Sequence, residues 1–402
     1  MNIEIQASTA RGTVVAPPSK SMAHRLLLCA AMSEEVSVIR DISSCEDVLA
    51  TLDCLRALGV ECTQVGADVT VRGRVPQRMV PAEPLRCRES GSTLRFMIPI
   101  AMMSGLSTVF YGEKGLMARP MGVYETLFGE QGKTFLCDGE SIVVKGPLNG
   151  GDYTLAGNVS SQFISGLLFA LPCAKEDSTI HITPPIESRS YIDLTLDALH
   201  SFGIVAAWQD EHTLRIPGAQ TYRAADIRVE GDYSSAAFTD AFNVLGGEVT
   251  VEGLRTDSIQ GDRVYKKHFE MLTRGVPTIH IGDCPDLGPI LFAVAAAKNG
   301  GVFTGTRRLR IKESDRAQAM AQELKKFGTT VSVYEDTVVI YPAEFHKPTQ
   351  PLLGHNDHRI VMALSVLLSL TGGVMEGAEA VSKSYPTFFD HLRSLGIEVQ
   401  TR

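Results

Sequence analysis

A short polar segment near the N-terminus carries the first residues suited to anion chemistry. Pro17, Pro18 and Ser19 lead through Lys20 and Ser21 to Arg25, and an apolar run follows at residues 26–32. Prolines and a serine are typical of a helix start, and a uniformly apolar run is typical of a buried helix. The free N–H groups and positive dipole end of such a helix, with Lys20 and Arg25, predict an anion site. The alternative is a capped helix with two solvated basic residues.

The same design recurs five more times along the chain. In each case a serine, aspartate or asparagine precedes an apolar run, which predicts six capped and buried helices. The capping segments are residues 19–21, 90–93, 160–162, 232–235, 286 and 356–357, and the apolar runs are 26–32, 94–103, 163–171, 236–245, 287–297 and 358–370.

Six glycines mark the same period independently. Each stands four residues after an apolar residue at the end of an amphipathic run, where a left-handed glycine commonly ends a helix. Both markers therefore predict six similar units along the chain. The glycines are separated by 53 to 73 residues and are Gly59, Gly132, Gly203, Gly275, Gly328 and Gly396.

Each unit is predicted to contain a buried helix, a short strand, an amphipathic outer helix and a hairpin, in a βαβαββ-like order. The fourth unit is shortened after Gly275, and the sixth ends at residues 397–400, one strand into its hairpin. The strand at residues 3–6 is expected to complete that hairpin. In the first three units the expected strands are 36–40, 60–65, 69–72, 108–111, 133–136, 142–145, 179–183, 204–208 and 213–216, and the outer helices are 47–58, 121–128 and 192–202.

Pairing of the two chain ends makes one domain discontinuous in sequence. The crossings are expected near Pro17 and Gly231, so residues 1–17 with 231–402 form one lobe and residues 18–230 form the other. The predicted fold is α/β (α+β), with two similar lobes of three βαβαββ units each and parallel buried helices. The helix starts of both lobes are expected to face one cleft, which is the predicted active site.

The composition narrows the class of protein. The chain has 402 residues, 44% of them hydrophobic and 21% charged, which is ordinary for a globular protein with two cores. A net charge of −8 argues against electrostatic nucleic-acid binding. Eight cysteines without a C-x-x-C pair favour free thiols in a reducing compartment. Without a signal-peptide pattern or an apolar run of roughly 20 residues, we expect a soluble, cytoplasmic protein.

Seven cations and several hydroxyl groups lie at the predicted helix starts. This combination suits a ligand with more than one phosphate or carboxylate group, even in a protein that is acidic overall. The residues are Lys20, Ser21, Arg25, Gly91, Ser92, Arg119, Ser160, Ser161, Gln162, Ser188, Tyr191, Asp286, Lys312, Glu313, Arg316, His358, Arg359 and Lys383.

Seven segments in this order resemble the EPSP synthase family, the 3-phosphoshikimate 1-carboxyvinyltransferases. The resemblance covers the whole chain and implies the enolpyruvyl transferase fold, in which two lobes of three βαβαββ units close on substrate. The segments are residues 17–25, 88–95, 119–121, 160–163, 311–316, 356–359 and Lys383.

The resemblance implies a reaction of aromatic amino-acid biosynthesis. The enolpyruvyl group of phosphoenolpyruvate passes to the 5-hydroxyl of shikimate 3-phosphate through a tetrahedral intermediate, and phosphate is released. It also implies a monomer that binds neither nucleic acid nor membrane and is a target of the herbicide glyphosate. No cofactor is expected, and His280, His355 and His358 show no zinc-site spacing with cysteines.

By position, the resemblance assigns two sets of substrate contacts. The set for shikimate 3-phosphate is Lys20, Ser21, Arg25, Ser160, Ser161, Gln162, Ser188, Tyr191, Asp286 and Lys312. The set for phosphoenolpyruvate is Lys20, Gly91, Arg119, Gln162, Arg316, Arg359 and Lys383.

The reaction needs a base for the 5-hydroxyl and an acid for the phosphoenolpyruvate methylene. Asp286 at a helix start suits the base, whereas Glu313 beside two cations would need burial to act as the acid. Lys20 is a third candidate, and the sequence leaves the partition among them open. The alternative is that Asp286, Ser90, Ser160 and Asp357 are only helix caps. Lys312 and Arg316 would then lie on one face of a solvated helix.

Two residues depart from the family pattern. Glu89 stands where many relatives carry asparagine, and Arg308 stands where some do. These departures leave the loop geometry and the affinity for shikimate 3-phosphate open.

Three other functions compete with this interpretation. The sister enzyme, UDP-N-acetylglucosamine 1-carboxyvinyltransferase, has Lys-Asn in place of Lys20-Ser21 and a loop cysteine near the position of Arg119. A non-catalytic anion-binding protein would lack the carboxylates. A nucleotide-binding enzyme would have a GxxxxGK[ST] or GxGxxG loop, and neither occurs.

Overall fold

The computed structural model describes residues 1–402, which divide into two compact units. Unit 1 comprises Met1–Pro17 and Gly231–Arg402, and unit 2 comprises Pro18–Glu230. Each unit has its own cluster of buried apolar residues. No helix is both long enough and apolar enough to cross a bilayer.

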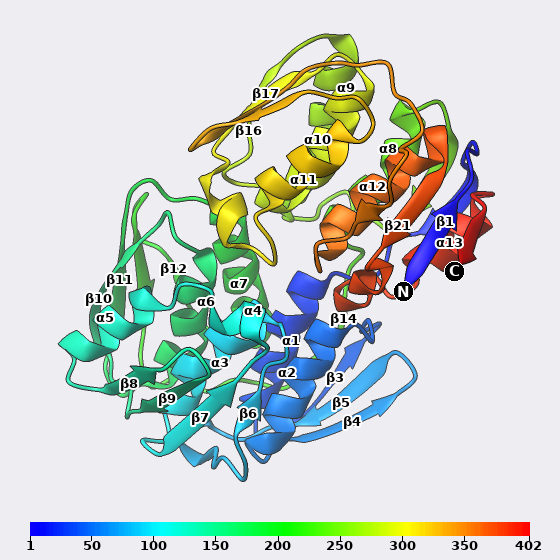
Figure 1. The fold of residues 1–402 in the computed structure, drawn as a ribbon. Coiled ribbons are helices and arrows are strands. Elements are labelled where there is room, and N and C mark those ends of the chain that lie inside the picture. The colour runs from blue at the N-terminus through cyan, green and yellow to red at the C-terminus, as the bar shows by residue number, and fades with distance from the viewer. The chain divides into compact units, whose positions relative to one another are not determined.

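Unit 2 contains three four-stranded sheets and the buried helices α1, α3 and α6 (Figure 1). The helices are α1 (Lys20–Ala31), α2 (Glu46–Ala57), α3 (Gly91–Met102), α4 (Lys114–Met117), α5 (Gly122–Glu130), α6 (Ser161–Ala170) and α7 (Arg189–Ser201). The sheets, in spatial order, are β14 (Asp226–Arg228), β3 (Val36–Arg40), β5 (Asp68–Arg72) and β4 (Glu61–Val65); β6 (Leu85–Arg86), β7 (Ser107–Tyr111), β9 (Ser141–Lys145) and β8 (Thr134–Cys137); and β10 (Gly151–Ala156), β11 (Ser178–Thr183), β13 (Thr213–Ile216) and β12 (Ala207–Trp208).

Unit 1 contains two four-stranded sheets, one two-stranded sheet and the buried helices α8, α10 and α12. The helices are α8 (Tyr233–Val244), α9 (Tyr265–Arg274), α10 (Gly288–Ala297), α11 (Arg316–Lys325), α12 (His358–Thr371) and α13 (Phe388–Ser394), with 3-10 turns at Gly261–Val264, Pro285–Leu287, Arg307–Ile311 and Ala378–Lys383. The sheets, in spatial order, are β20 (Leu352–Leu353), β21 (Gly373–Glu376), β1 (Asn2–Ile5) and β22 (Val399–Thr401); β16 (Thr278–His280), β17 (Gly301–Thr304), β19 (Thr337–Ile340) and β18 (Val331–Val333); and β15 (Glu248–Glu252) and β2 (Arg11–Val15).

All five four-stranded sheets share one pairing pattern, which confirms the predicted α/β repeat. In each sheet one parallel pair of strands is extended by two antiparallel pairings. At α3, α6, α10 and α12 the parallel pair consists of the strands before and after the helix. In the fourth of the six predicted repeats the sheet consists only of β15 and its parallel partner β2, because no hairpin follows α9.

Five of the six buried helices have the predicted side-chain cap. The carboxylate or hydroxyl of each cap accepts a hydrogen bond from a first-turn N–H, as at Asp232 and Asp357. The prediction is wrong for α10, which begins at Gly288 without a side-chain cap. Pro289 in its first turn has no N–H to satisfy, and Asp286 lies in the preceding 3-10 turn.

Five of the six marker glycines are left-handed, with φ between 65° and 95°. Gly275 is the exception, since its φ of 170° is extended backbone. The prediction of a left-handed stop is therefore wrong there, because the chain continues in extended form toward β16, which lies parallel to β17. A strand expected over residues 204–208 is also shorter than predicted and covers only Ala207–Trp208.

The two chain ends lie in the same sheet, as Figure 1 shows beside the N and C labels. Ile3 is opposite Thr401 in the antiparallel pair of β1 and β22, and β1 also pairs with β21. This confirms the expected pairing of the ends. At each crossing from one unit to the other, the strand before the next helix pairs within its own unit: β2 precedes α1 but pairs with β15, whereas β14 precedes α8 but pairs with β3.

The interior position of β1 makes a stability prediction. Ile5 is 0% exposed, so Ile5→Ala should lower the free energy of unfolding by about 2 to 5 kcal/mol through lost burial and a cavity. Val65→Ala in β4, where the side chain is 75% exposed, should change it by less than about 0.5 kcal/mol. Urea unfolding followed by circular dichroism measures both. Equal midpoints would contradict the packing of the N-terminal strand.

Candidate active site

Asp286 forms ion pairs with three cations of unit 1. Its Oδ1 lies 3.2 Å from Lys312 Nζ and 2.9 Å from Arg316 Nη1, and its Oδ2 lies 2.9 Å from Arg359 Nη2. The turn at Pro285–Leu287, at the start of α10, positions this side chain, which remains 20% exposed. Because α10 has no side-chain cap, Asp286 is not the helix cap that the alternative interpretation required.

Arg316 is the buried centre of the same cluster. Its guanidinium is 1% exposed and binds Glu313 Oε2 at 2.5 Å and Asp357 Oδ2 at 2.8 Å, besides Asp286. Burial opposes the charge of Arg316, but the three carboxylates raise its pKa above the ordinary value. Asp357, which is 0% exposed, also caps α12 by accepting from Arg359 N at 2.9 Å. One carboxylate thus fixes both the helix start and the buried arginine.

Lys312 is a cation of this cluster whose ammonium has a lowered pKa. Burial lowers the pKa of its ammonium to about 8, against the opposing effect of Asp286. The positive charges of Arg308 and Arg316 lower it further. Arg308, left out of the predicted site, is only 5% exposed and donates to the Gly282 carbonyl at 3.4 Å.

Two more predicted cations are held by neighbouring polar groups in unit 1. Arg359 Nη1 donates to Ser234 Oγ at 2.6 Å and to the Asp286 carbonyl at 3.2 Å. Lys383 Nζ donates to the Asn356 carbonyl at 2.5 Å, one residue before Asp357. Unit 1 therefore brings together six of the residues predicted for it, which are Asp286, Lys312, Glu313, Arg316, Arg359 and Lys383.

A further acid lies buried beside this cluster. Asp262 is 3% exposed, and its side chain is hydrogen-bonded to Ser234. Burial and then the negative charge of Asp286 raise the pKa of Asp262 to about 6. No group of three or more His, Cys, Asp or Glu side chains is arranged to hold a metal ion.

In unit 2 the start of α3 faces two arginines. A methyl group at Gly91 would lie 2.9 Å from Arg119 Nη1 and 3.1 Å from Arg95 Nη1. Gly91 is not among the residues with positive φ, so a left-handed backbone does not explain this glycine. Gln162 at the start of α6 accepts from Arg95 at 2.7 Å and donates to Ser92 Oγ at 3.0 Å. Gly91, Arg119 and Gln162 are thus brought together as predicted from the sequence.

Lys20 and Arg25, on the first two turns of α1, have different surroundings. Lys20 Nζ pairs with Asp47 Oδ2 at 2.7 Å, and both side chains are mostly buried. Arg25 is held by hydroxyl and carbonyl oxygens: it donates to Thr195 Oγ1 at 2.9 Å and to the carbonyls of Ser21 and Tyr191 at 2.7 and 2.9 Å. Burial lowers the pKa of Arg25 to about 10.

The remaining predicted residues of unit 2 lie at the starts of α6 and α7. Ser160 caps α6 by accepting from Gln162 N, and Ser161 is 4% exposed in the first turn. Ser188 precedes α7 with a left-handed φ of 57° and is 1% exposed, three residues before Tyr191. Their common place at helix starts is as predicted, although Ser160 is also a cap.

Sequence reasoning missed the groups that hold these cations in place. The sequence pattern indicates Asp47 only as the start of an outer helix and Asp357 only as a cap. It indicates Ser234 only as part of a capping segment and Arg95 only as the last residue of a segment that resembles the family. Their partners are distant in sequence, and helix-start position was the one available signal.

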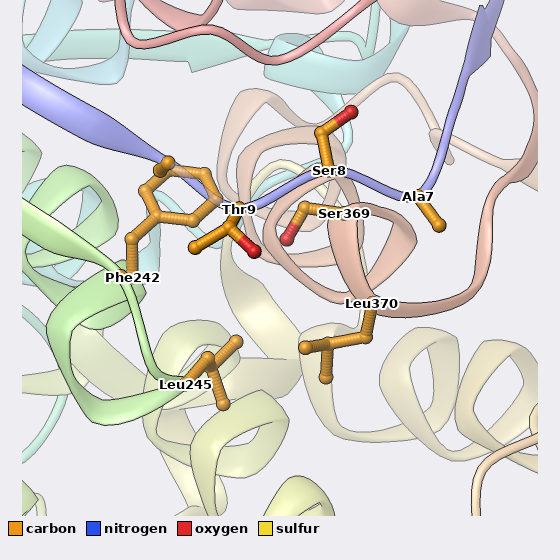
Figure 2. Close-up of a pocket in the computed structure, with 9 residues that line it drawn as sticks. Ala7, Ser8, Thr9, Phe242, Leu245, Ser369 and Leu370 are labelled. Carbon is orange, nitrogen blue, oxygen red and sulfur yellow. The ribbon is translucent and has the colours of Figure 1, made fainter.

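A separate hollow of about 290 Å³ in unit 1 does not suit anions. Figure 2 shows Phe242 and Leu245 on one side of it and Leu370 on the other. Its remaining lining is small or hydroxylated, and it carries no charged side chain. The cation clusters are therefore the better candidates for an anionic substrate.

The buried pair of Asp357 and Arg316 makes a stability prediction. Asp357→Asn keeps an oxygen for the cap but removes the charge, so unfolding free energy should fall by about 3 kcal/mol. Asp315→Asn is the matched control, because Asp315 caps α11 without being buried and should change it by less than about 0.5 kcal/mol. Urea denaturation compares them. A similar small effect for both would mean that Asp286 and Glu313 suffice to balance Arg316.

Comparison with known proteins places the chain in a family. The family model described as EPSP synthase (3-phosphoshikimate 1-carboxyvinyltransferase) matches residues 5–392. The 3-phosphoshikimate 1-carboxyvinyltransferases of Clostridium kluyveri and Clostridium acetobutylicum are 39% and 38% identical to this chain, covering 99% of it and 98% of each relative. The structure of EPSP synthase from Acinetobacter baumannii superposes with a TM-score of 0.79 at 25% identity, covering 100% of both chains. This chain therefore belongs to the EPSP synthase family.

Proposed function

We propose that this protein transfers the enolpyruvyl group of phosphoenolpyruvate to the 5-hydroxyl of shikimate 3-phosphate and releases phosphate. The observation that carries the proposal is Asp286, a carboxylate that faces three cations. Such a group combines a proton acceptor with the positive charge that two anionic substrates require. Membership of the EPSP synthase family supports the same reaction.

In this proposal the two units supply different parts of one active site. Unit 2 contributes Gly91, Arg119 and Gln162 to phosphoenolpyruvate, and unit 1 contributes Arg316, Arg359 and Lys383. The contacts to shikimate 3-phosphate are Lys20, Ser21, Arg25, Ser160, Ser161, Gln162, Ser188 and Tyr191 from unit 2, with Asp286 and Lys312 from unit 1. The proposal therefore requires residues of both units for one substrate pair.

The ion pairs of Asp286 suggest how substrate binding prepares the base. When the phosphate and carboxylate groups of the substrates take up hydrogen bonds from Lys312, Arg316 and Arg359, Asp286 shares fewer cations. A carboxylate with weaker cation pairing holds a proton more tightly, which favours removal of the hydroxyl proton. Glu313 and Lys20 are the candidates for protonating the methylene, and the same cations stabilise the departing phosphate.

The oligomeric state, the partners and the location of the protein are part of the same proposal. One chain carries both sets of contacts, which supports a monomer as the active form. The absence of a nucleic-acid or membrane partner and a cytoplasmic location are proposed because both substrates are small, water-soluble anions.

Phosphate release tests the function directly. The protein should release phosphate from phosphoenolpyruvate when shikimate 3-phosphate is present and not when it is omitted. Release with UDP-N-acetylglucosamine instead would identify the sister reaction. Binding of both anions without any release would indicate a non-catalytic anion-binding protein.

Asp286→Asn separates chemistry from binding. The substitution keeps the shape but removes the proton acceptor, so kcat should fall by about 100-fold or more while shikimate 3-phosphate still binds. Asp283→Asn is the matched control, since Asp283 is exposed three residues earlier and should retain kcat within about twofold. Steady-state kinetics and calorimetric titration provide the two readouts. A kcat in Asp286→Asn close to that of the control would remove Asp286 from the role of base.

Lys312 predicts a pH dependence of substrate binding. Below pH 8 the free enzyme carries the protonated ammonium, and as pH rises through about 8 the charge is lost. The KM for shikimate 3-phosphate should therefore rise roughly tenfold between pH 7 and 9.5, the loss of one charge-assisted contact. Lys312→Arg keeps its charge over this range and should flatten the profile. Identical profiles for the two proteins would exclude Lys312 as the titrating group.

A further inference from the structure

A chain of buried hydrogen bonds joins the starts of α1, α2 and α3 in unit 2. His24 Nδ1 lies 2.8 Å from Thr51 Oγ1, and Thr51 Oγ1 lies 2.8 Å from Thr93 Oγ1. Thr93 Oγ1 donates to Ser90 Oγ at 2.8 Å, directly beside Gly91. All four side chains are at most 1% exposed. Burial makes each bond costly to lose, because a hydroxyl without its partner stays desolvated.

The donor in each hydrogen bond of this chain can be assigned from the bond between Thr93 and Ser90. Since Thr93 gives its proton to Ser90, the proton between the threonines must come from Thr51. Thr51 then accepts from His24, whose Nδ1 carries the proton while Nε2 has no hydrogen-bond partner. Burial lowers the pKa of His24 well below its ordinary value, with further lowering by Lys20 and Arg25. The ring is therefore neutral, with a defined tautomer.

A second chain joins α1 to α7 and α6. Thr195 Oγ1 accepts from Arg25 Nε at 2.9 Å and donates to the Tyr191 carbonyl at 3.0 Å. Ser165 Oγ lies 2.8 Å from Thr195 Oγ1 and therefore donates to it. Thr195 and Ser165 are 0% exposed. This chain fixes Arg25, which donates its remaining hydrogen bonds to backbone carbonyls.

Gln162 links the helices of the two chains. Its side chain connects α6 to α3 by accepting from Arg95 and donating to Ser92. These side-chain bonds connect five helices in a closed order, α1, α2, α3, α6, α7 and back to α1, which we call the hydroxyl ring; the helix backbones of α1, α3 and α6 join its separate bonds. Apolar packing alone tolerates small shifts between helices, whereas buried hydrogen bonds have fixed lengths and directions.

We propose that Thr51 and Thr195 are positioning residues for different substrates of this enzyme. Thr51 acts through Thr93 and Ser90 on Gly91, in the subsite for phosphoenolpyruvate, and Thr195 acts through Arg25 in the subsite for shikimate 3-phosphate. The inference rests on the proposed function, because that function defines the two subsites. It adds that the hydroxyl ring sets the two affinities separately.

Isosteric valine substitutions test this separation. Thr51→Val should raise the KM for phosphoenolpyruvate at least fivefold and leave the KM for shikimate 3-phosphate within twofold. Thr195→Val should do the reverse. Thr239→Val is the matched control, since Thr239 is 1% exposed in α8 and its hydroxyl bonds only its own helix; it should change neither KM. Thr51→Ser and Thr195→Ser keep the hydroxyl and should restore both values.

The outcomes of these experiments separate failure of the positioning roles from failure of the proposed function. Wild-type protein without phosphate release would refute the proposed function and the subsite roles with it. Normal wild-type turnover with both KM values shifted equally, or with neither shifted, would refute only the ring. Nitrogen NMR of His24 in wild-type protein needs no variant to fold: a proton on Nδ1 and none on Nε2 is expected from pH 5.5 to 8. A proton on Nε2 would overturn the chain through Thr51.

Discussion

The guanidinium of Arg316 is buried among three carboxylates, and the arrangement of unit 1 around Asp286 depends on that pairing. A buried charge without a partner costs several kcal/mol, so Asp357 and Glu313 must keep their places as firmly as Arg316 does. Asp357 in turn begins α12 and thereby places Arg359 against Asp286. One desolvated cation thus determines where the carboxylate proposed as base can lie.

Arg25 of unit 2 is held differently from the cations around Asp286 in unit 1. In unit 1, carboxylates neutralise the cluster before any substrate arrives. In unit 2, Arg25 is held by carbonyl and hydroxyl oxygens, which orient a charge without cancelling it. This difference agrees with the proposed roles of Asp286 as a base and of Arg25 as a contact for shikimate 3-phosphate.

Local sequence signals predicted the fold because helix caps and left-handed glycines act within a few residues. Ser19, Ser90 and Asp357 cap as expected, while Asp286 and Gly275 break the pattern where the chain has a proline or continues as a strand. The partners of the site cations were not predictable in the same way. Asp47 meets Lys20 only through tertiary packing, and no periodicity in sequence encodes that contact. The substrate contacts themselves stay predictions.

The discontinuity of unit 1 in the sequence has a consequence for biosynthesis. Unit 2 is encoded in one stretch, Pro18–Glu230, so all of its residues have been synthesised before most of unit 1 exists. The strand β1 is made before unit 2, whereas both of its neighbours, β21 and β22, are made after unit 2. While unit 2 is synthesised, β1 therefore has no partner strand. We expect unit 2 to fold as a domain before the sheet that contains β1 can form.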